Sequence, residues 1–128
     1  LMAPGRIGQI LNLPTATLDG APYSPSARRE TRMYGLITRL TAYSGRRDEL
    51  SLCLLGPHLR RPGCHSYVLA HDLNDADALW ITEVWMDKAT HDAWSADIHE
   101  TGILRPALAL IATFGDTIFT RPLGGVGL

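Results

Sequence analysis

The 128-residue sequence has almost no excess of charge of either sign, because twelve Lys and Arg stand against thirteen Asp and Glu. A net charge of -1 offers no field that would attract nucleic acid or an anionic membrane, so we expect neither as a partner. No apolar run approaches the roughly 18 residues of a membrane span, and the first residues lack the basic-then-apolar pattern of a secretory signal. We therefore expect a cytoplasmic protein.

Cysteines are few, and motifs that bind cofactors are missing. Cys53 and Cys64 show no CxxC spacing, so we interpret them as reduced, partly buried thiols rather than a disulfide. The sequence contains no glycine-rich loop of the dinucleotide-binding type and no cluster of three metal ligands. We expect no cofactor and no bound metal.

The composition that remains is typical of a globular protein, with 45% hydrophobic and 20% charged residues. Its length allows one buried core. Residues 1–32 are interrupted by prolines and glycines and show no sustained period, which indicates an N-terminal arm with "IGQIL" as its apolar anchor on the body or on a partner subunit. We assign residues 33–123 to one domain and residues 124–128 to a tail.

Hydrophobic periods within the domain alternate between two and about four residues. Period two and turn signals predict strands at residues 33–43, 62–72, 78–87 and 116–123. Helical spacing predicts helices at residues 44–61 with Ser44 as the N-cap, 88–100 with Asp87 as the N-cap, and 106–114 with Pro106 in the first turn. The order β-α-β-β-α-β predicts an α+β, ferredoxin-like fold: an antiparallel sheet with helices on one face.

The second face of this sheet then lacks a cover. In the first strand Leu36 and Leu40 lie on one face, whereas Ile37 and Arg39 lie on the other. A chain this small covers such a face most simply with a second copy of itself, so we predict a homodimer.

Residues 62–99, "PGCHSYVLAHDLNDADALWITEVWMDKATHDAWSADIH", carry two motifs in register. The first is Pro-Gly-Cys-x-x-Tyr ending at Tyr67, and the second is Glu-x-Trp-x-Asp from Glu83 to Asp87. With them the sequence resembles the antibiotic biosynthesis monooxygenase family over about residues 33–122. The resemblance implies a dimeric α+β barrel with the sheets face to face and a pocket between sheet and helices. It also implies oxidation of electron-rich phenols, hydroquinones or anthrones by O₂ without flavin or metal.

Departures from the family pattern narrow the implied activity. Many quinol-oxidising members have a His-x-x-x-x-His pair at the end of the helix; here Trp94 stands at the first position and His99 at the second. Haem-degrading relatives use an Asn on the first strand and a later His, but Thr38 stands at the Asn position and "GILRPA" supplies no His. The resemblance therefore argues against haem cleavage.

The candidate catalytic residues are His99 and Trp94. A neutral imidazole near pH 7 can accept a phenolic proton, although a solvent-exposed His past the helix end is an equal alternative. Trp94 shares one helix face with His91 and Ile98, where it either stacks on a ligand or fills the core. The candidate substrate-binding residues, which would shape a flat apolar slot, are Thr38, Leu36, Leu40, Tyr67 and His91.

Other residues favour structural roles. Trp85 shares a strand face with apolar neighbours and is expected to pack, and we favour an ion pair between Glu83 and Arg39 over a catalytic carboxylate. Asp87 and His91 have metal-ligand spacing, but a cap and a surface His explain them better. His65 and His71 are too far apart along their strand for one metal. The leading hypothesis is a cofactor-independent monooxygenase acting on an aromatic small molecule and O₂, and the alternative is a non-catalytic dimeric binding or scaffold module.

Overall fold

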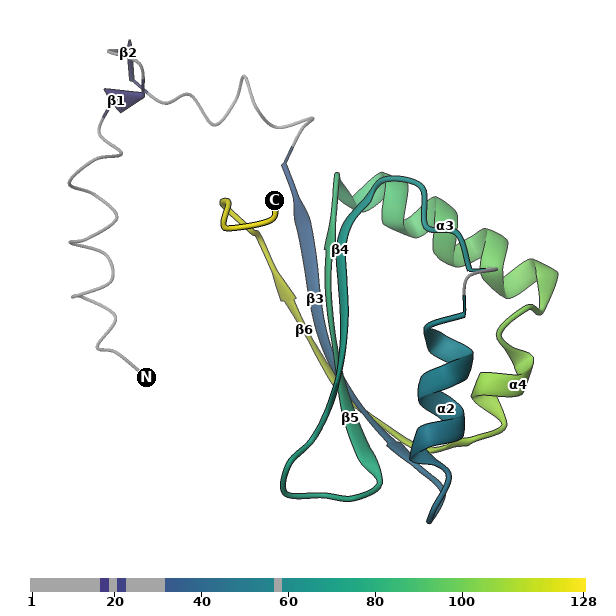
Figure 1. Cartoon of the computed structure of the whole chain (residues 1–128). Helices are drawn as coiled ribbons and strands as arrows, with labels where there is room; N and C mark the ends of the chain where they lie inside the picture. The colour runs from purple at the N-terminus through teal and green to yellow at the C-terminus, as the bar shows by residue number, and fades with distance from the viewer. Residues whose placement is uncertain (1–16, 19–20, 23–31, 57–58) are drawn as a thin grey trace. The chain divides into compact units, whose positions relative to one another are not determined.

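The computed structural model describes residues 17–18, 21–22, 32–56 and 59–128 (Figure 1). The chain divides into two units, Leu1–Glu30 and Thr31–Leu128. In the first unit the backbone of β1 (Thr17–Leu18) pairs antiparallel with that of β2 (Ala21–Pro22). The predicted apolar anchor at residues 7–11 lies outside the described residues, so it stays a prediction.

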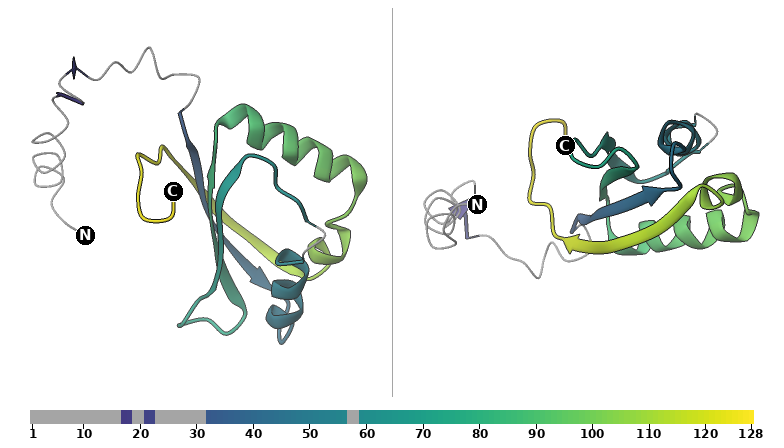
Figure 2. Two further views of the ribbon diagram at one scale, coloured as in Figure 1. Left: turned by 45° about the horizontal axis from the view of Figure 1, so that its top comes forward. Right: turned by 90° about the horizontal axis from the view of Figure 1, so that it is seen from below.

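The second unit has the predicted order of strands and helices. Its elements are β3 (Tyr34–Ala42), α2 (Arg47–Leu54), β4 (Cys64–His71), β5 (Ala78–Trp85), α3 (Lys88–Thr101), α4 (Arg105–Leu108) and β6 (Ile111–Thr120). The strands form one antiparallel sheet in the order β4-β5-β3-β6. Figures 1 and 2 show α2, α3 and α4 on the same side of this sheet. The predicted ferredoxin-like α+β fold is confirmed.

The core lies between the sheet and the helices. Alternation in β3 and β5 turns every second side chain toward α2 and α4, and Leu50 and Leu79 have no exposed surface at all. The buried cluster comprises Leu40, Ala42, Leu50, Leu54, Leu79, Ile81, Ala107, Leu110 and Ile111.

None of the described helices of the second unit covers the opposite face of the sheet. Val68, Thr82, Ile37 and Ile118 are in register and form a row across the four strands. Val68 and Ile118 are 53% and 54% exposed. Among the described residues of the second unit, the face for which the sequence predicts a second copy is therefore uncovered; the homodimer itself stays a prediction.

The helix starts were predicted with mixed success. Asp87 is the N-cap of α3, since its carboxylate accepts a hydrogen bond of 2.7 Å from the Thr90 amide, as predicted. Ser44 is not the cap of α2, which begins after Arg46 without a side-chain cap. Asp48 and Glu49 occupy the first turn of α2 and stabilise the positive end of its dipole instead.

The last helix and strand also differ from the prediction. The helix that contains Pro106 is only four residues long, and β6 begins at Ile111 rather than at residue 116. Ile111 pairs with Ala42 of β3, and Phe114 pairs with Leu40. Pairing with a strand already in the sheet therefore overrides the helical spacing of residues 107–114.

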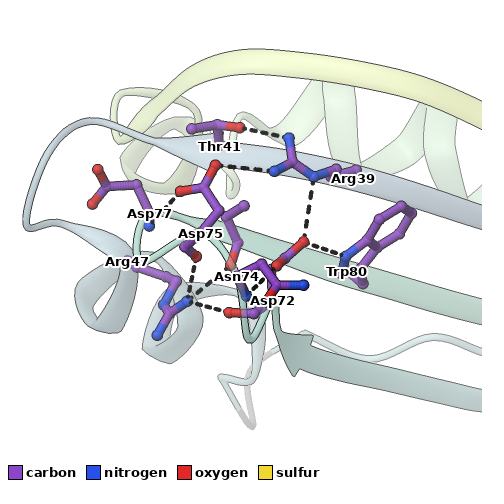
Figure 3. A network of polar contacts seen from close by, with 9 residues as sticks. Arg39, Thr41, Arg47, Asp72, Asn74, Asp75, Asp77 and Trp80 are labelled. Atoms are coloured by element: carbon purple, nitrogen blue, oxygen red, sulfur yellow. Dashed lines mark hydrogen bonds and ion pairs between the residues drawn. The ribbon is translucent and has the colours of Figure 1, made fainter.

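A polar network fixes the turn between β4 and β5 (Figure 3). Arg39 donates to Asp75 at 3.0 Å and lies 3.6 Å from Asp72, whose carboxylate also accepts from the Trp80 indole at 2.9 Å. The predicted ion pair between Arg39 and Glu83 is therefore wrong. Glu83 is in register with Leu36 on the helix side of the sheet, whereas Arg39 is in register with Trp80 on the open side.

Within the described part of the chain, each helix is too short or too polar to cross a lipid bilayer.

Candidate active site

Aromatic rings join the end of β5 to the first turns of α3. Trp85 is fully buried, and its indole donates to the Glu83 carboxylate at 2.9 Å. Its ring centroid lies 5.2 Å from those of both His91 and Trp94, and His91 lies 5.3 Å from Tyr34. Contacts of this geometry add to the burial energy and hold α3 against the sheet. The packing role predicted for Trp85 is confirmed.

Trp94 is half-buried and has both a packed side and an open side. Its indole donates to the Arg60 carbonyl at 2.8 Å, and its ring packs on Trp85. The same side chain lines two cavities. Trp94 therefore stabilises the junction and still presents surface that a ligand can reach.

One of these cavities lies between α3 and α4 and has a volume of about 330 Å³. We call it the α3–α4 cavity. Its lining residues are Trp94, Ser95, Ile98, His99, Gly102, Leu104, Arg105 and Leu108. The two predicted catalytic residues thus line the same cavity, because positions 94, 98 and 102 form one row along α3 and positions 95 and 99 form the row beside it.

The α3–α4 cavity has an apolar interior and a polar rim. Leu104 packs against the buried core, and Trp94 and Ile98 are half-buried. His99 and Arg105, by contrast, are exposed. In the described residues no hydrogen bond or ion pair holds the His99 imidazole, so it is available to a ligand.

None of the five predicted substrate-binding residues lines this cavity. Leu36 and Leu40 are buried, Leu40 within the core cluster, and the Thr38 hydroxyl shares a 3.3 Å hydrogen bond with Thr117 of β6. His91 lies between the rings of Tyr34, Trp85 and Trp94, and its Nδ1 is 3.0 Å from Asp92.

Tyr67 lies behind Trp94, against an arginine that the sequence did not single out. The Arg61 guanidinium is 3.7 Å from the centre of the Tyr67 ring and 5.5 Å from that of Trp94. Arg61 also donates to the carbonyls of Leu54 and Leu59. Burial raises the pKa of Tyr67, and the charge of Arg61 opposes the rise. Tyr67 is therefore neutral at pH 7, within a cation–π contact.

The cysteines and histidines elsewhere in the fold give no second centre. Cys53 and Cys64 are free, as predicted, and burial raises the pKa of Cys64 above its usual range. No group of three metal-ligating side chains occurs among the described residues. The Asp87 carboxylate is engaged as the helix cap, and His58 lies outside the described residues.

Sequence reasoning missed Ser95 and Gly102 on the α3 side of the cavity. It also missed Leu104, Arg105 and Leu108 on the opposite side. They follow the turn at Gly102, which has a φ of 68° and ends α3. The available signal was Gly102 itself, since a glycine C-cap predicts that the chain turns back across the last turn of the helix.

Comparison with known families agrees with this arrangement. The sequence profile of the antibiotic biosynthesis monooxygenases matches residues 33–99. The chain belongs to the antibiotic biosynthesis monooxygenase family. The match includes Trp94 and His99 but ends before the α4 side of the cavity.

Solved structures support the same assignment. A Chloroflexus aurantiacus protein assigned to this family is 40% identical, with a TM-score of 0.66 over 73% of this chain and 95% of that chain. Proteins from Pseudomonas aeruginosa and Mycobacterium tuberculosis share the fold at 23% and 18% identity, with TM-scores of 0.60 and 0.58. The alignments cover 74% and 73% of this chain and 98% of each of those proteins. No curated protein matches the chain.

Proposed function

We propose that this protein is a cofactor-independent monooxygenase that oxidises an aromatic hydroquinone, anthrone or related phenol to a quinone with O₂. The observation that supports this most directly is the α3–α4 cavity, which Trp94 and His99 both line in a member of a monooxygenase family. An aromatic wall and an imidazole that could accept a proton, both at one cavity, support this reaction.

The chemistry needs only the substrate, O₂ and a base. Deprotonation of the phenol or anthrone gives an anion that passes one electron to O₂. The resulting radical pair recombines with formation of a C–O bond to a peroxide. The O–O bond then breaks, one oxygen stays on the ring as the new carbonyl, and the other leaves as water with two substrate hydrogens. A less polar environment than water raises the reducing power of the anion.

The chain contributes positioning, partial exclusion of water and proton transfer. Trp94 supplies a flat surface for the aromatic ring, and Ile98 and Leu104 cover its edges with apolar groups. His99, at the rim of the same cavity, accepts the proton.

Replacement of His99 tests this role. We expect His99→Ala to lower kcat in an O₂-uptake assay by about 10²-fold, the usual contribution of a general base, without changing the melting temperature. His65→Ala is the matched control, because His65 is also exposed but lies on β4 and does not line the cavity. If His99→Ala keeps the wild-type kcat, His99 is not the base. If a panel of hydroquinones and anthrones produces no O₂ uptake with the wild-type protein, the proposed reaction is wrong.

A non-catalytic binding or scaffold module is the second candidate, and the packed side of Trp94 favours it. The indole N–H is already engaged by Arg60, and the ring contacts Trp85. Trp94→Phe separates the two: a stacking wall predicts a folded protein with a higher KM, whereas a purely structural ring predicts a lower melting temperature and no substrate-dependent change.

The proposal includes a homodimer formed through the open face of the sheet. Ile118 and Val68 are each more than half exposed there, and the C-terminal residues Leu123 and Val126 are exposed as well. We expect light scattering at micromolar concentration to give twice the chain mass, and Ile118→Lys to give a monomer. Leu52→Lys is the control, since Leu52 is 75% exposed on α2, away from that face. A wild-type protein that is strictly monomeric would contradict the proposal.

A further inference from the structure

We infer that the α3–α4 cavity is selective for an aromatic substrate that carries a carboxylate, and that Arg105 is the residue that selects it. This inference rests on the proposed function for the reacting ring and adds the class of substrate. Its basis is the division of the cavity into an apolar interior and a cationic rim.

Arg105 lines the α3–α4 cavity beside the end of α3. The guanidinium lies over Gly102, where Nε and Cζ are 2.8 and 3.1 Å from the position that a Cβ would occupy. The absent side chain at Gly102 therefore leaves the place that Arg105 fills beside the cavity. The Arg105 amide also donates to the Gly102 carbonyl at 3.1 Å, which fixes the backbone of this turn.

Within the part of the chain that the structure describes, the Arg105 guanidinium makes no hydrogen bond or ion pair. Other arginines bind internal acceptors: Arg39 binds Asp72 and Asp75, and Arg47 binds three carbonyls. In contrast, no carboxylate among the described residues lies within 4.0 Å of the Arg105 guanidinium. A planar guanidinium with free donors matches a carboxylate in two parallel hydrogen bonds.

The cavity sets the orientation and size of such a ligand. Leu104 lies toward the core and Arg105 toward solvent, so the ring enters first and the carboxylate stays at the rim. Ser95 and His99 are one helical turn apart on the same rim. A volume of about 330 Å³ is near the lower limit for small-molecule sites, which favours a ligand of two or three fused rings.

A simpler role for Arg105 is to stabilise the negative end of the α3 dipole. That role predicts a loss of stability on replacement, restored by lysine, and no preference among ligands. The carboxylate role predicts that replacement of Arg105 changes the ratio of the affinities for an acid and for its neutral analogue, both measured on the same variant. A ratio is insensitive to a modest loss of stability, so it separates the two roles.

The test compares 2-naphthoic acid with its neutral analogue 2-naphthamide by isothermal titration calorimetry. We expect the wild-type protein to bind the acid about five- to tenfold more tightly, as for a charge-assisted pair at a partly exposed site. R105Q should abolish this preference, and R105K should retain only part of it. R60Q should keep this preference, because Arg60 does not line the α3–α4 cavity but the second cavity, which also borders Trp94.

Equal affinity of the wild-type protein for acid and amide would overturn the inference, as would a preference that survives in R105Q or is lost in R60Q. Neither probe is a hydroquinone, so binding is measured independently of oxidation. Acid selectivity without O₂ uptake would refute the proposed reaction alone. Oxidation of hydroquinones without acid selectivity would refute the role of Arg105 alone.

Discussion

The substitution Trp85→Phe tests whether the junction between β5 and α3 holds the site in place. Trp85 is one of the largest fully buried side chains of the protein, and Phe keeps an aromatic ring in the same place. The substitution removes the indole N–H, which donates to Glu83 at 2.9 Å. It also replaces the two fused rings of the indole by one, so the contact with Trp94 becomes smaller.

The expected loss of stability follows from these two changes. Truncation of a buried Trp to Ala costs about 3–5 kcal/mol, so the smaller change to Phe costs less from packing alone. An acceptor that loses its donor inside the protein costs a further ~1–3 kcal/mol. We expect Trp85→Phe to lower the free energy of unfolding by about 2–4 kcal/mol in total. A small domain has about 5–15 kcal/mol of stability, so the variant should remain folded.

Trp80→Phe is the matched control, because the same change is made five residues earlier on the same strand. Trp80 is 36% exposed on the open side of the sheet, and its indole donates to an aspartate that water can also reach. Urea unfolding followed by far-UV circular dichroism measures both effects, with each substitution made in the Ile118→Lys chain so that the open face of the sheet is not covered by a second copy. With a slope of about 2 kcal/mol per M, the midpoint of Trp85→Phe should fall by about 1–2 M, and that of Trp80→Phe by clearly less.

Equal shifts for the two variants would refute the reasoning, since burial would then not distinguish the two rings. A second readout connects this loss to the site. Trp85 supports Trp94 and His91 through ring contacts, so Trp85→Phe should also weaken ligand binding in the α3–α4 cavity, whereas Trp80→Phe should not.

Two further predictions concern pH. The hydrogen bonds from Thr90 lower the pKa of Asp87, so this carboxylate stabilises the fold above its unfolded pKa of about 3.9 and ceases to do so as pH falls through the lower folded value. Asp87→Ala should therefore reduce the melting temperature at pH 7, and this difference from wild type should shrink as pH falls through the folded pKa of Asp87, whereas Asp97→Ala on the same helix should have little effect at neutral or acid pH. Burial raises the pKa of Tyr67, so the unfolded state ionises first and stability falls as pH rises above about 10; Tyr67→Phe should flatten that loss in melts between pH 8 and 11, and an unchanged slope would contradict the assignment.

Features that depend on neighbouring residues in the sequence could be predicted. The alternation in β5 and the cap at Asp87 are local patterns, and both are present in the structure. The ion pair of Glu83 failed because it depends on which side chains share a face after β3 and β5 pair. The start of β6 failed for a similar reason, since Ile111 becomes a strand residue only when Ala42 is beside it.

The candidate site follows the same division. Trp94 and His99 were both candidates from the sequence, Trp94 from the helix face that it shares with His91 and Ile98 and His99 from the family pattern, but that they line one cavity was not predicted. The opposite wall could not be predicted, because it depends on where the turn at Gly102 directs Leu104 and Arg105. Tyr67 was expected beside Trp94 in an open slot, but Arg61 contacts both rings there.

Gly63, in the Pro-Gly-Cys motif, connects that motif to the α3 side of the cavity. Gly63 has a φ of 83°, and a Cβ there would overlap the methyl group of Thr90 in the first turn of α3. Its carbonyl also accepts the Met86 amide at 2.8 Å, just before that helix begins. The glycine therefore sets how closely α3 approaches the loop before β4, and with it the position of Trp94. Family resemblance at residues 62–87 thus reports on the placement of the α3 wall, whereas Arg105 lies outside the residues matched by the family profile, and its proposed role toward a carboxylate rests on the lining of the α3–α4 cavity.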